Sequence, residues 1–463
     1  MKKIYVIILG IVITICIVII LIISPNKQTN TKITNKTTST EIIYEEKNID
    51  WEDLETYDLN ITDSTTITKE GIYNITGSIS NGMITINTNG YVKLILNNIT
   101  ITNSNGPAIY IENSKTTIIE LQNENTITSN GSNELDASVY SKDDLIIEGD
   151  GKLIINSSQD GIVSKDDLII NNGNIIINSK DDGIRGKDSV VINDGNIKIT
   201  AEGDGIKSTN DQDAEKGYIL INNGNIEINS KLDAIQAETK LVINDGNINI
   251  KTTGTDNQES EKGLKTDTLI EINGGTFNIN STDDSIHTNG FITINKGNFT
   301  LTSKDDAIHA DGMIEINNGT FEINAHEGIE ATYIKINDGN ISISASDDGI
   351  NATNKSKEYE TLVEINGGNI NITMGAGDTD GVDSNGNIII NGGTISVTGN
   401  STFDYDGTGT INGGTVIVNG ETVTSLPNQM MGGPGMGNMQ QPGMNDMGQP
   451  RNNNMNRGGR NMQ

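Results

Sequence analysis

The chain has almost no cysteine and few aromatic residues. Its 463 residues include one cysteine, Cys16, and aromatic residues make up 4% of the total. A single cysteine excludes an internal disulfide and a thiolate metal cluster. Because Cys16 lies inside an apolar run, a cysteine nucleophile is excluded from the rest of the chain.

Basic residues are scarce as well. Lysine and arginine number 31 against 62 aspartate and glutamate residues, which gives a formal net charge of -31. This charge argues against nucleic acid as a partner, because phosphate binding needs a clustered basic surface. The negative charge favours cations as partners, and anions where a bound cation bridges them to the protein.

The N-terminus carries a long apolar run. Residues 4–23 are almost wholly apolar and follow Lys2 and Lys3, and about 20 such residues suffice to cross a bilayer core. No small-x-small cleavage motif precedes Pro25. We expect residues 1–24 to form a signal anchor or transmembrane helix of a single-pass cell-membrane protein whose ectodomain is extracellular. A cleaved signal peptide, which would give a secreted protein, is the alternative.

Two segments lack any hydrophobic period. Residues 25–50 are rich in Asn, Thr and Lys and are typical of a polar linker. Residues 427–463 are rich in Met, Gly, Pro and Gln, which predicts a disordered tail. Contact of this tail with an anionic wall polymer, or binding of a soft metal by Met, is the alternative. Residues 51–426 remain as one predicted domain.

A unit of about 22 residues repeats through this domain. Each unit contains an acidic residue followed by Gly, Ala or Ser and then Ile or Val. These acidic residues are Asp160, Asp182, Asp204, Asp233, Asp284, Asp306, Glu327, Asp348 and Asp380, and Lys262 holds the position in one divergent unit. An Asn-x-Gly motif follows about eleven residues later, from Asn171 to Asn391. The repeat is the main signal for the fold.

Short runs of Ile and Val between these motifs predict strands. Three short strands and three corners in about 22 residues predict an all-β solenoid, the parallel β-helix. Coils stacked at about 4.8 Å place like residues above one another. We therefore expect an asparagine ladder at one corner and an inward apolar column that includes Phe277, Phe299 and Phe321 in consecutive coils.

The acidic residues form a second column, here named the ladder. Adjacent like charges one coil apart repel by about 0.9 kcal/mol in water and about 3.5 kcal/mol at an effective dielectric of 20, which calls for a counterion. Calcium fits, because it takes six to eight oxygen ligands. The predicted calcium ligands are Asp181, Asp182, Asp204, Asp233, Asp283, Asp284, Asp305, Asp306, Asp347, Asp348 and Asp380. The alternative is that Asp suits tight turns and keeps the protein soluble.

A third column lies three residues past the ladder. Its basic members, the predicted substrate-binding residues, are Arg185, Lys207, Lys265, His287 and His309. Beside calcium they would hold an acidic polysaccharide, and alternatively they pair with the ladder acids. The scarcity of aromatic residues disfavours neutral glucans. Insertions near 209–215, 252–260 and 353–359 are either binding loops or surface variation.

Several segments resemble a known family. They are GIYNITG at 71–77, LILNNITITNS from Leu94, SKDDLIIEGDGKLII from Ser141 and the repeated DDGI units. Together, over about residues 57–426, they resemble the clostridial cell-surface carbohydrate-binding β-helix family. The resemblance implies a right-handed parallel β-helix similar to pectate lyases, calcium binding, and affinity for polysaccharides such as polygalacturonate or cellulose.

Three functions are consistent with the sequence. The favoured one is a non-catalytic, calcium-dependent polysaccharide-binding protein of the cell surface, selective for acidic glycans. The second is a polysaccharide lyase in which Lys207, Lys265 or Arg185 acts as base beside calcium. The third is a structural or adhesive spacer. We expect no catalytic residues, because the acids recur around the whole helix whereas an enzyme needs one distinctive group of residues. The oligomeric state stays open.

Overall fold

The computed structural model describes residues 49–130, 134–255, 260–375 and 379–428. These ranges hold 43 strands, from β1 (Thr56–Ile61) to β43 (Glu421–Val423), all within the predicted domain 51–426. None of the described segments forms a helix long and apolar enough to cross a membrane. The predicted anchor at 1–24, nearly all of the linker and the tail beyond residue 428 lie outside the described residues.

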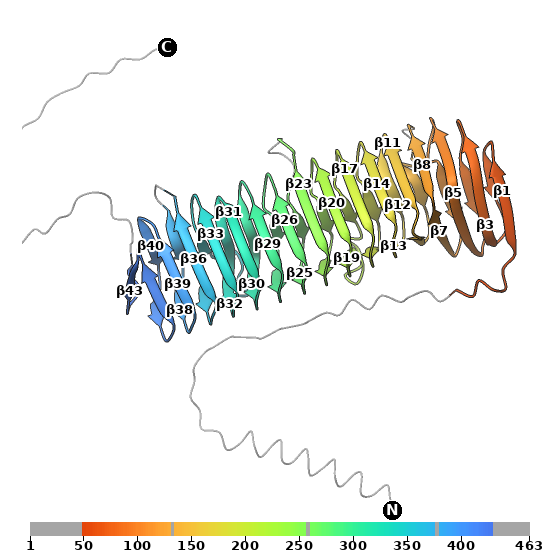
Figure 1. Cartoon of the computed structure of the whole chain (residues 1–463). Helices are drawn as coiled ribbons and strands as arrows, with labels where there is room; N and C mark the ends of the chain where they lie inside the picture. The colour runs from red at the N-terminus through yellow and green to blue at the C-terminus, as the bar shows by residue number, and fades with distance from the viewer. Residues whose placement is uncertain (1–48, 131–133, 256–259, 376–378, 429–463) are drawn as a thin grey trace, which may run out of the picture.

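Each strand pairs in parallel with the strand three places further along the chain in the regular coils. Thus β11 (Lys152–Ser157) pairs with β14 (Asn174–Ser179), which pairs with β17 (Asn196–Ala201). Every coil contributes one strand to each of three faces. The chain is therefore a parallel β-helix, as predicted, with its strands stacked along one axis from β1 to β43 (Figure 1). Its right-handed sense stays a prediction.

The first face carries the inward column that includes the phenylalanines. Its strands are β8 (Glu124–Ser129), β11, β14, β17, β20 (Asn225–Ser230), β23 (Asn247–Thr252), β26 (Thr276–Asn280), β29 (Asn298–Thr302), β31 (Thr320–Ala325), β33 (Asn340–Ala345), β36 (Asn369–Met374), β39 (Thr394–Thr398) and β42 (Thr415–Val418).

The second face begins at the ladder corner, and we call it the ladder face. Its strands are β6 (Ile109–Asn113), β9 (Ala137–Ser141), β12 (Asp160–Ser164), β15 (Ile184–Gly186), β18 (Ile206–Ser208), β21 (Ile235–Ala237), β24 (Leu264–Thr266), β27 (Ile286–Thr288), the first parts of β30 (Asp306–Ile316) and β32 (Glu327–Ile336), then β34 (Ile350–Ala352), β37 (Asp380–Ser384) and β40 (Ser401–Tyr405).

The third face completes each coil. Its strands are β7 (Thr116–Gln122), β10 (Leu145–Glu148), β13 (Asp167–Ile170), β16 (Ser189–Ile192), β19 (Tyr218–Ile221), β22 (Lys240–Ile243), β25 (Leu269–Ile272), β28 (Phe291–Ile294), the later parts of β30 and β32, then β35 (Leu362–Ile365), β38 (Asn387–Ile390) and β41 (Gly409–Ile411). The first coils are less regular and use β1, β2 (Thr65–Ile67), β3 (Gly71–Ile79), β4 (Ile84–Asn87) and β5 (Tyr91–Asn103).

The interior is a stack of like side chains. Phe277, Phe299 and Phe321 are buried and stack face to face, with ring centroids 4.7 and 4.5 Å apart and rings within 6° of parallel. The rest of the predicted inward column is also buried: Ile175, Ile197, Ile226, Ile248, Ile341, Ile370 and Ile395. The predicted apolar column is confirmed.

The asparagine ladder is confirmed as well. The Nδ2 atom of Asn193 donates to Oδ1 of Asn171 at 2.8 Å, and the same bond recurs from coil to coil as far as Asn412 and Asn391, also at 2.8 Å. The glycine two residues later turns the corner in the left-handed region, as at Gly195 with φ 127°. A Cβ there would lie 3.0 Å from the carbonyl oxygen of Gly173, so the corner requires glycine.

An apolar stripe lies on the outside of the third face. It consists of Ile118, Ile146, Ile169, Val191, Leu220 and Val242, with Ile49, Trp51 and Tyr218 packed against it. Runs such as Val190 to Ile192 therefore bury their first and last side chains in the core and their middle one in this stripe.

The C-terminal end of the solenoid differs from the rest. Here β43 turns back and pairs antiparallel with β42. The last strand of the first face is thereby paired with a strand of opposite direction.

Candidate functional site

The ladder carboxylates bind backbone groups of the next coil. Oδ1 of Asp160 accepts the backbone N–H of Asp182 at 3.0 Å, and Oδ1 of Asp182 accepts that of Asp204 at 2.8 Å. The same bond links Asp204 to Asp233, Asp233 to Lys262, Asp284 to Asp306 and Asp348 to Asp380, at 2.8 to 3.0 Å. One oxygen of each of these carboxylates is therefore part of the fold.

The second oxygen meets the predicted substrate-binding residues. Nζ of Lys207 lies 2.5 Å from Oδ2 of Asp204, and Nζ of Lys265 lies 2.9 Å from Oδ2 of Asp233. Equivalent contacts join Arg185 to Asp160 at 2.8 Å, His287 to Asp284 at 2.7 Å and His309 to Asp306 at 2.5 Å. All five residues thus pair with ladder acids, the alternative that the sequence left open.

These residues belong to a longer column of outward side chains on the ladder face. In register, coil by coil, this outward column runs Tyr110, Tyr140, Val163, Arg185, Lys207, Gln236, Lys265, His287, His309, Glu330, Asn351, Asp383 and Asp404. Its chemistry changes along the solenoid from aromatic through basic to acidic. One column therefore offers three different environments.

The aromatic end carries three lysines that stand outside the ion pairs formed among the described residues. The rings of Tyr110 and Tyr140 meet edge to face with centroids 6.1 Å apart, and the Nζ atoms of Lys142 and Lys165 each lie 5.5 Å from one of these centroids. The three lysines lie in successive coils. The backbone N–H of Lys165 donates to the carbonyl oxygen of Ser141, and that of Lys187 donates to the carbonyl oxygen of Ser164. None of the three lysines forms an ion pair with any carboxylate in the part of the chain that the structure describes. We call these five residues the lysine patch.

Burial and the nearby Arg185 lower the pKa of Lys165. The repeat did not indicate the patch, because Tyr110 and Tyr140 lie before the first DGI unit. A signal was available, since Lys142, Lys165 and Lys187 each precede an aspartate at the same place in the coil.

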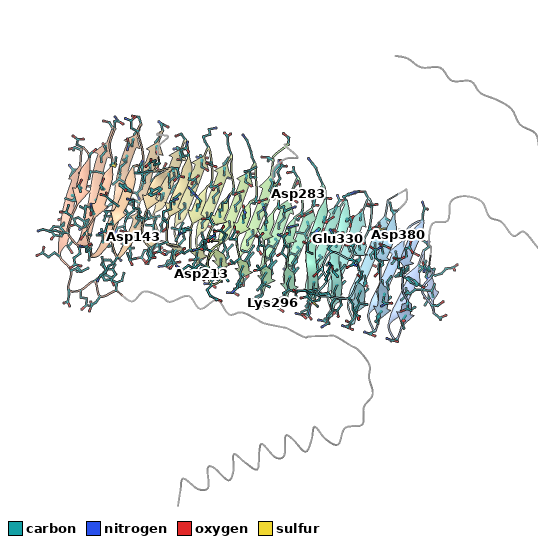
Figure 2. The ribbon with its side chains drawn as sticks, turned by 180° about the vertical axis from the view of Figure 1, so that it is seen from behind. Asp143, Asp213, Asp283, Lys296, Glu330 and Asp380 are labelled. Atoms are coloured by element: carbon teal, nitrogen blue, oxygen red, sulfur yellow. The ribbon has the colours of Figure 1, made fainter. Side chains whose placement is uncertain are left out.

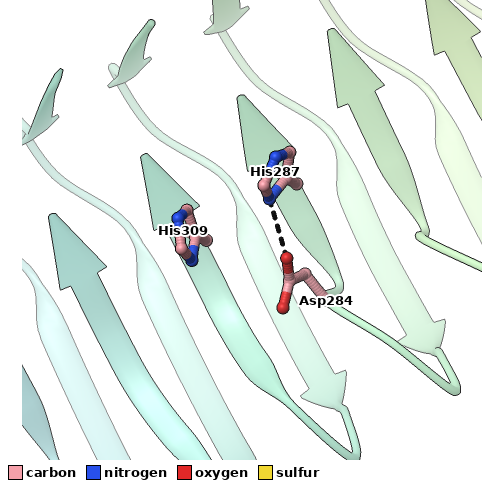
Figure 3. A group of neighbouring side chains, drawn as sticks. All are labelled: Asp284, His287 and His309. Carbon is pink, nitrogen blue, oxygen red and sulfur yellow. Dashed lines mark hydrogen bonds and ion pairs between the residues drawn. The ribbon is translucent and has the colours of Figure 1, made fainter. Parts of the chain in front are cut away.

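The middle of the outward column holds two stacked histidines. His287 on β27 and His309 on β30 have ring centroids 4.7 Å apart at an angle of 29°, with Asp284 beside them (Figure 3). Burial alone would lower the pKa of His309, but its hydrogen bonds to Asp306 and Glu330 overcome this and raise the pKa to about 10.

The insertion at 353–359 reaches back to this region. Nζ of Lys355 lies 3.3 Å from Nε2 of His309 and also pairs with Glu330. One of the predicted surface loops therefore contacts the outward column.

The last part of the outward column is acidic. Burial, with repulsion from neighbouring carboxylates, raises the pKa of Asp383 to about 7, and it raises the pKa of the adjacent ladder acids Asp348 and Glu327 to about 6 and about 8. No described lysine or arginine forms an ion pair with Asp348 or Asp383. The buried Asn351 donates to Glu327 at 3.0 Å, while its Oδ1 has no hydrogen-bond partner among the described residues. This end of the column thus lacks an internal counterion.

Three groups of carboxylates converge closely enough to share a cation, with one oxygen of each member within 4.8 Å of the others. Two contain predicted calcium ligands: Asp160 with Asp181 and Asp182, and Asp283 with Asp284 and Asp305. The third, Asp144 with Asp166 and Asp167, lies at the next corner and was not predicted. Figure 2 shows that Asp143, Asp283, Glu330 and Asp380 are spread along the length of the solenoid. Acidic groups are therefore not confined to one centre.

Comparison with known proteins identifies the family. The family model described as carbohydrate-binding domain-containing protein matches residues 62–307 and 302–426. The chain belongs to this carbohydrate-binding domain family. The resemblance seen in the sequence is thus confirmed, and carbohydrate binding is the activity of the family.

Two relatives of this carbohydrate-binding domain are similar over part of its length. A carbohydrate-binding domain-containing protein of Acetivibrio thermocellus is 32% identical over 117 residues, which is 22% of this chain and 41% of the relative. The alignment thus spans less than half of that protein. A solved structure of the polysaccharide lyase-like protein from C. thermocellum, a gadolinium derivative, is 28% identical with a TM-score of 0.40, and the match covers 52% of this chain and 95% of that one.

Proposed function

We propose that this carbohydrate-binding domain binds an acidic polysaccharide without cleaving it, and that calcium assists. The observation that supports an acidic ligand is the lysine patch, where three lysines that form no ion pair among the described residues stand together in a chain of net charge -31. Elsewhere on the ladder face the basic side chains are neutralised by ladder acids. An acidic ligand can form ion pairs with the three ammonium groups of the patch without breaking an existing ion pair.

The spacing of the patch suits a polymer. Lys142, Lys165 and Lys187 occupy successive coils, so their ammonium groups recur at about the 4.8 Å spacing of neighbouring strands. A chain of uronate sugars laid along the axis presents a series of carboxylates to them. Tyr110, which is half-buried, adds apolar ring surface of the kind that packs against sugar C–H groups, whereas Tyr140 is buried beside it and supports its ring.

We propose the acidic end of the outward column as a calcium site. Asp383 of the column and the neighbouring ladder residue Asp348 offer carboxylate oxygens, and Oδ1 of Asn351, which has no hydrogen-bond partner among the described residues, adds an amide oxygen. Oxygen-only donors suit a hard cation such as calcium. The groups around Asp182 and Asp284 are further calcium candidates, although Arg185 and Lys262 already compensate part of their charge.

Localisation is part of the proposal. We propose that residues 1–24 anchor the protein in the cell membrane and that the solenoid projects outside the cell. The apolar run at 4–23 and the basic residues before it support this arrangement.

The lyase alternative is disfavoured by the ion pairs. Arg185, Lys207 and Lys265, the candidate bases, each contact a buried ladder carboxylate. An ammonium or guanidinium group held by a carboxylate keeps its proton, whereas a general base must be free of it.

Calorimetric titration with polygalacturonate oligomers tests the proposal. We expect saturable binding in calcium that weakens in chelator, and at least a tenfold loss of affinity in a triple variant Lys142→Gln, Lys165→Gln and Lys187→Gln. The matched control is Lys152→Gln, Lys180→Gln and Lys198→Gln, which removes the same charge from lysines that are paired with Glu124, Glu202 and Glu227.

Equal losses in the two triple variants would contradict a specific lysine patch. Absence of binding to polygalacturonate, with binding to a neutral glucan instead, would overturn the acidic preference. Heat that continues long after each injection, with new unsaturated products, would establish the lyase.

A further inference from the structure

The histidine pair has a donor set that neither calcium nor a sugar requires. The chain contains three histidines, and two of them occupy the same position in adjacent coils, His287 and His309. Imidazole nitrogens favour zinc, nickel, cobalt and copper, whereas calcium takes oxygen ligands. A pair of histidines brought into contact in this way therefore points to a different class of ion.

The geometry brings these nitrogens together with a buried carboxylate. One donor atom from each of Asp284, His287 and His309 lies within 4.8 Å of the other two (Figure 3). Nδ1 of His287 is 2.7 Å from Oδ2 of Asp284, and the stacked rings are 4.7 Å apart. Asp284 is only 3% exposed, and its other oxygen is fixed by the backbone N–H of Asp306. The carboxylate is thus held rigidly by the fold.

The surroundings carry excess negative charge. Carboxylates outnumber positive groups here, six to three: Asp283, Asp284, Asp305, Asp306, Asp311 and Glu330 against Lys262, Lys355 and His309, whose proton a bound ion would replace. A divalent cation would reduce this excess. Asp306 and Glu330 both lie against Nδ1 of His309, at 2.5 and 3.1 Å, where they orient the ring. Carboxylates that orient a ligating histidine are common around zinc.

We propose that Asp284, His287 and His309 form a binding site for a divalent transition-metal ion of the zinc class. The three protein ligands supply two nitrogens and one oxygen and leave a fourth position for water or for an oxygen of a bound ligand. Zinc bonds of about 2.0 to 2.2 Å require only small shifts of side chains that already lie within 4.8 Å.

Lys355 already contacts Nε2 of His309, and Lys262 competes with the ion for Asp284. Nζ of Lys262 lies 2.7 Å from Oδ2 of Asp284 and 2.8 Å from Oδ2 of Asp283. The ammonium group occupies part of the space beside Asp284. Metal binding therefore displaces Lys262, and removal of this charge should strengthen the site.

Calorimetric titration of zinc into the full-length protein, with calcium at saturation, tests the site. We expect one zinc ion per chain that calcium does not displace, and at least a tenfold loss of affinity in His287→Asn and in His309→Asn. The matched control is His326→Asn, because the third histidine lies in another part of the coil, near Ser346 and Asp347. It should bind zinc like the wild type.

Two further measurements keep the test decisive if a histidine variant fails to fold. Lys262→Gln should bind zinc more tightly than the wild type, and an unchanged or weaker affinity would contradict the proposal. Cobalt in place of zinc should give the intense visible absorption of a four-coordinate site containing nitrogen ligands. Equal zinc binding in the three histidine variants, or no zinc binding by the wild type, would overturn it.

Discussion

The backbone N–H of Asp204 donates to the side chain of Asp182, the ladder residue of the preceding coil, at 2.8 Å. This single contact explains why an acidic residue recurs at the corner whether or not a cation binds. The carboxylate replaces a carbonyl group as acceptor where the chain turns, and the buried N–H of the next coil depends on it. Repulsion between ladder acids is offset by these N–H groups and, over much of the ladder, by basic side chains.

The first prediction concerns this acceptor. Asp182→Ala leaves the buried N–H of Asp204 without a partner and should lower the free energy of unfolding by about 1 to 3 kcal/mol. Asp182→Asn keeps an acceptor oxygen and should cost distinctly less. Chemical denaturation of the two variants measures the difference, and equal costs would show that charge rather than hydrogen bonding is what matters.

The second prediction concerns calcium at the acidic end. Calcium at about 100 times its dissociation constant should stabilise the wild type by about 2.7 kcal/mol, and chelator should remove this gain. Asp383→Asn should lose most of the calcium-dependent gain. Asp204→Asn, at a carboxylate that pairs with Lys207, is the control and should keep it. If calcium stabilises Asp383→Asn as much as the wild type, the calcium site lies elsewhere in the protein.

The third prediction concerns pH. Burial and repulsion from Asp306 and Glu330 raise the pKa of Glu327 from 4.5 to about 8. Between these values the folded protein holds a proton that the unfolded chain has lost, so the contribution of Glu327 to stability falls as pH rises from 4.5 to 8. Thermal melts in chelator should show a smaller decline over this range in Glu327→Gln. Parallel declines in both proteins would contradict the shift.

The fourth prediction concerns the phenylalanine stack. Phe299 lies between Phe277 and Phe321 with both faces covered. Phe299→Ala leaves a cavity and should cost about 3 to 5 kcal/mol, whereas Phe299→Leu should cost much less. Denaturant titration followed by circular dichroism measures both. A small cost for Phe299→Ala would mean that neighbouring coils collapse into the space.

Residue periodicity predicted much of the fold. Asn193 and Asn171, or Phe299 and Phe321, stand one repeat apart in sequence and therefore one coil apart in space. Such contacts follow directly from stacking each repeat on the one before it. The same reasoning predicted that Arg185 and Lys207 stand beside the ladder, but it left open whether they face a ligand or the acids.

The remaining contacts depend on features that a repeat does not encode. Lys355 reaches His309 across 46 positions because an insertion folds back over the surface. The contact between Tyr110 and Tyr140 could not be derived from the repeat, because neither residue lies in a DGI unit and the earliest coils have different lengths. Alternation turns Val191 outward, yet it is buried because the apolar stripe on the third face covers it. Such features require the path of the loops and the register of each coil.

The direction of the hydrogen bonds gives the molecule a mechanical property. Backbone bonds between coils and both side-chain ladders run along the axis of the solenoid. A force that pulls its two ends apart therefore loads the coils in series, and they detach one at a time rather than together. Each coil of about 22 residues extends to roughly 75 Å when it unwinds, against about 4.8 Å when folded. A tethered solenoid of this kind would lengthen stepwise under load while the coils still folded keep their binding surfaces.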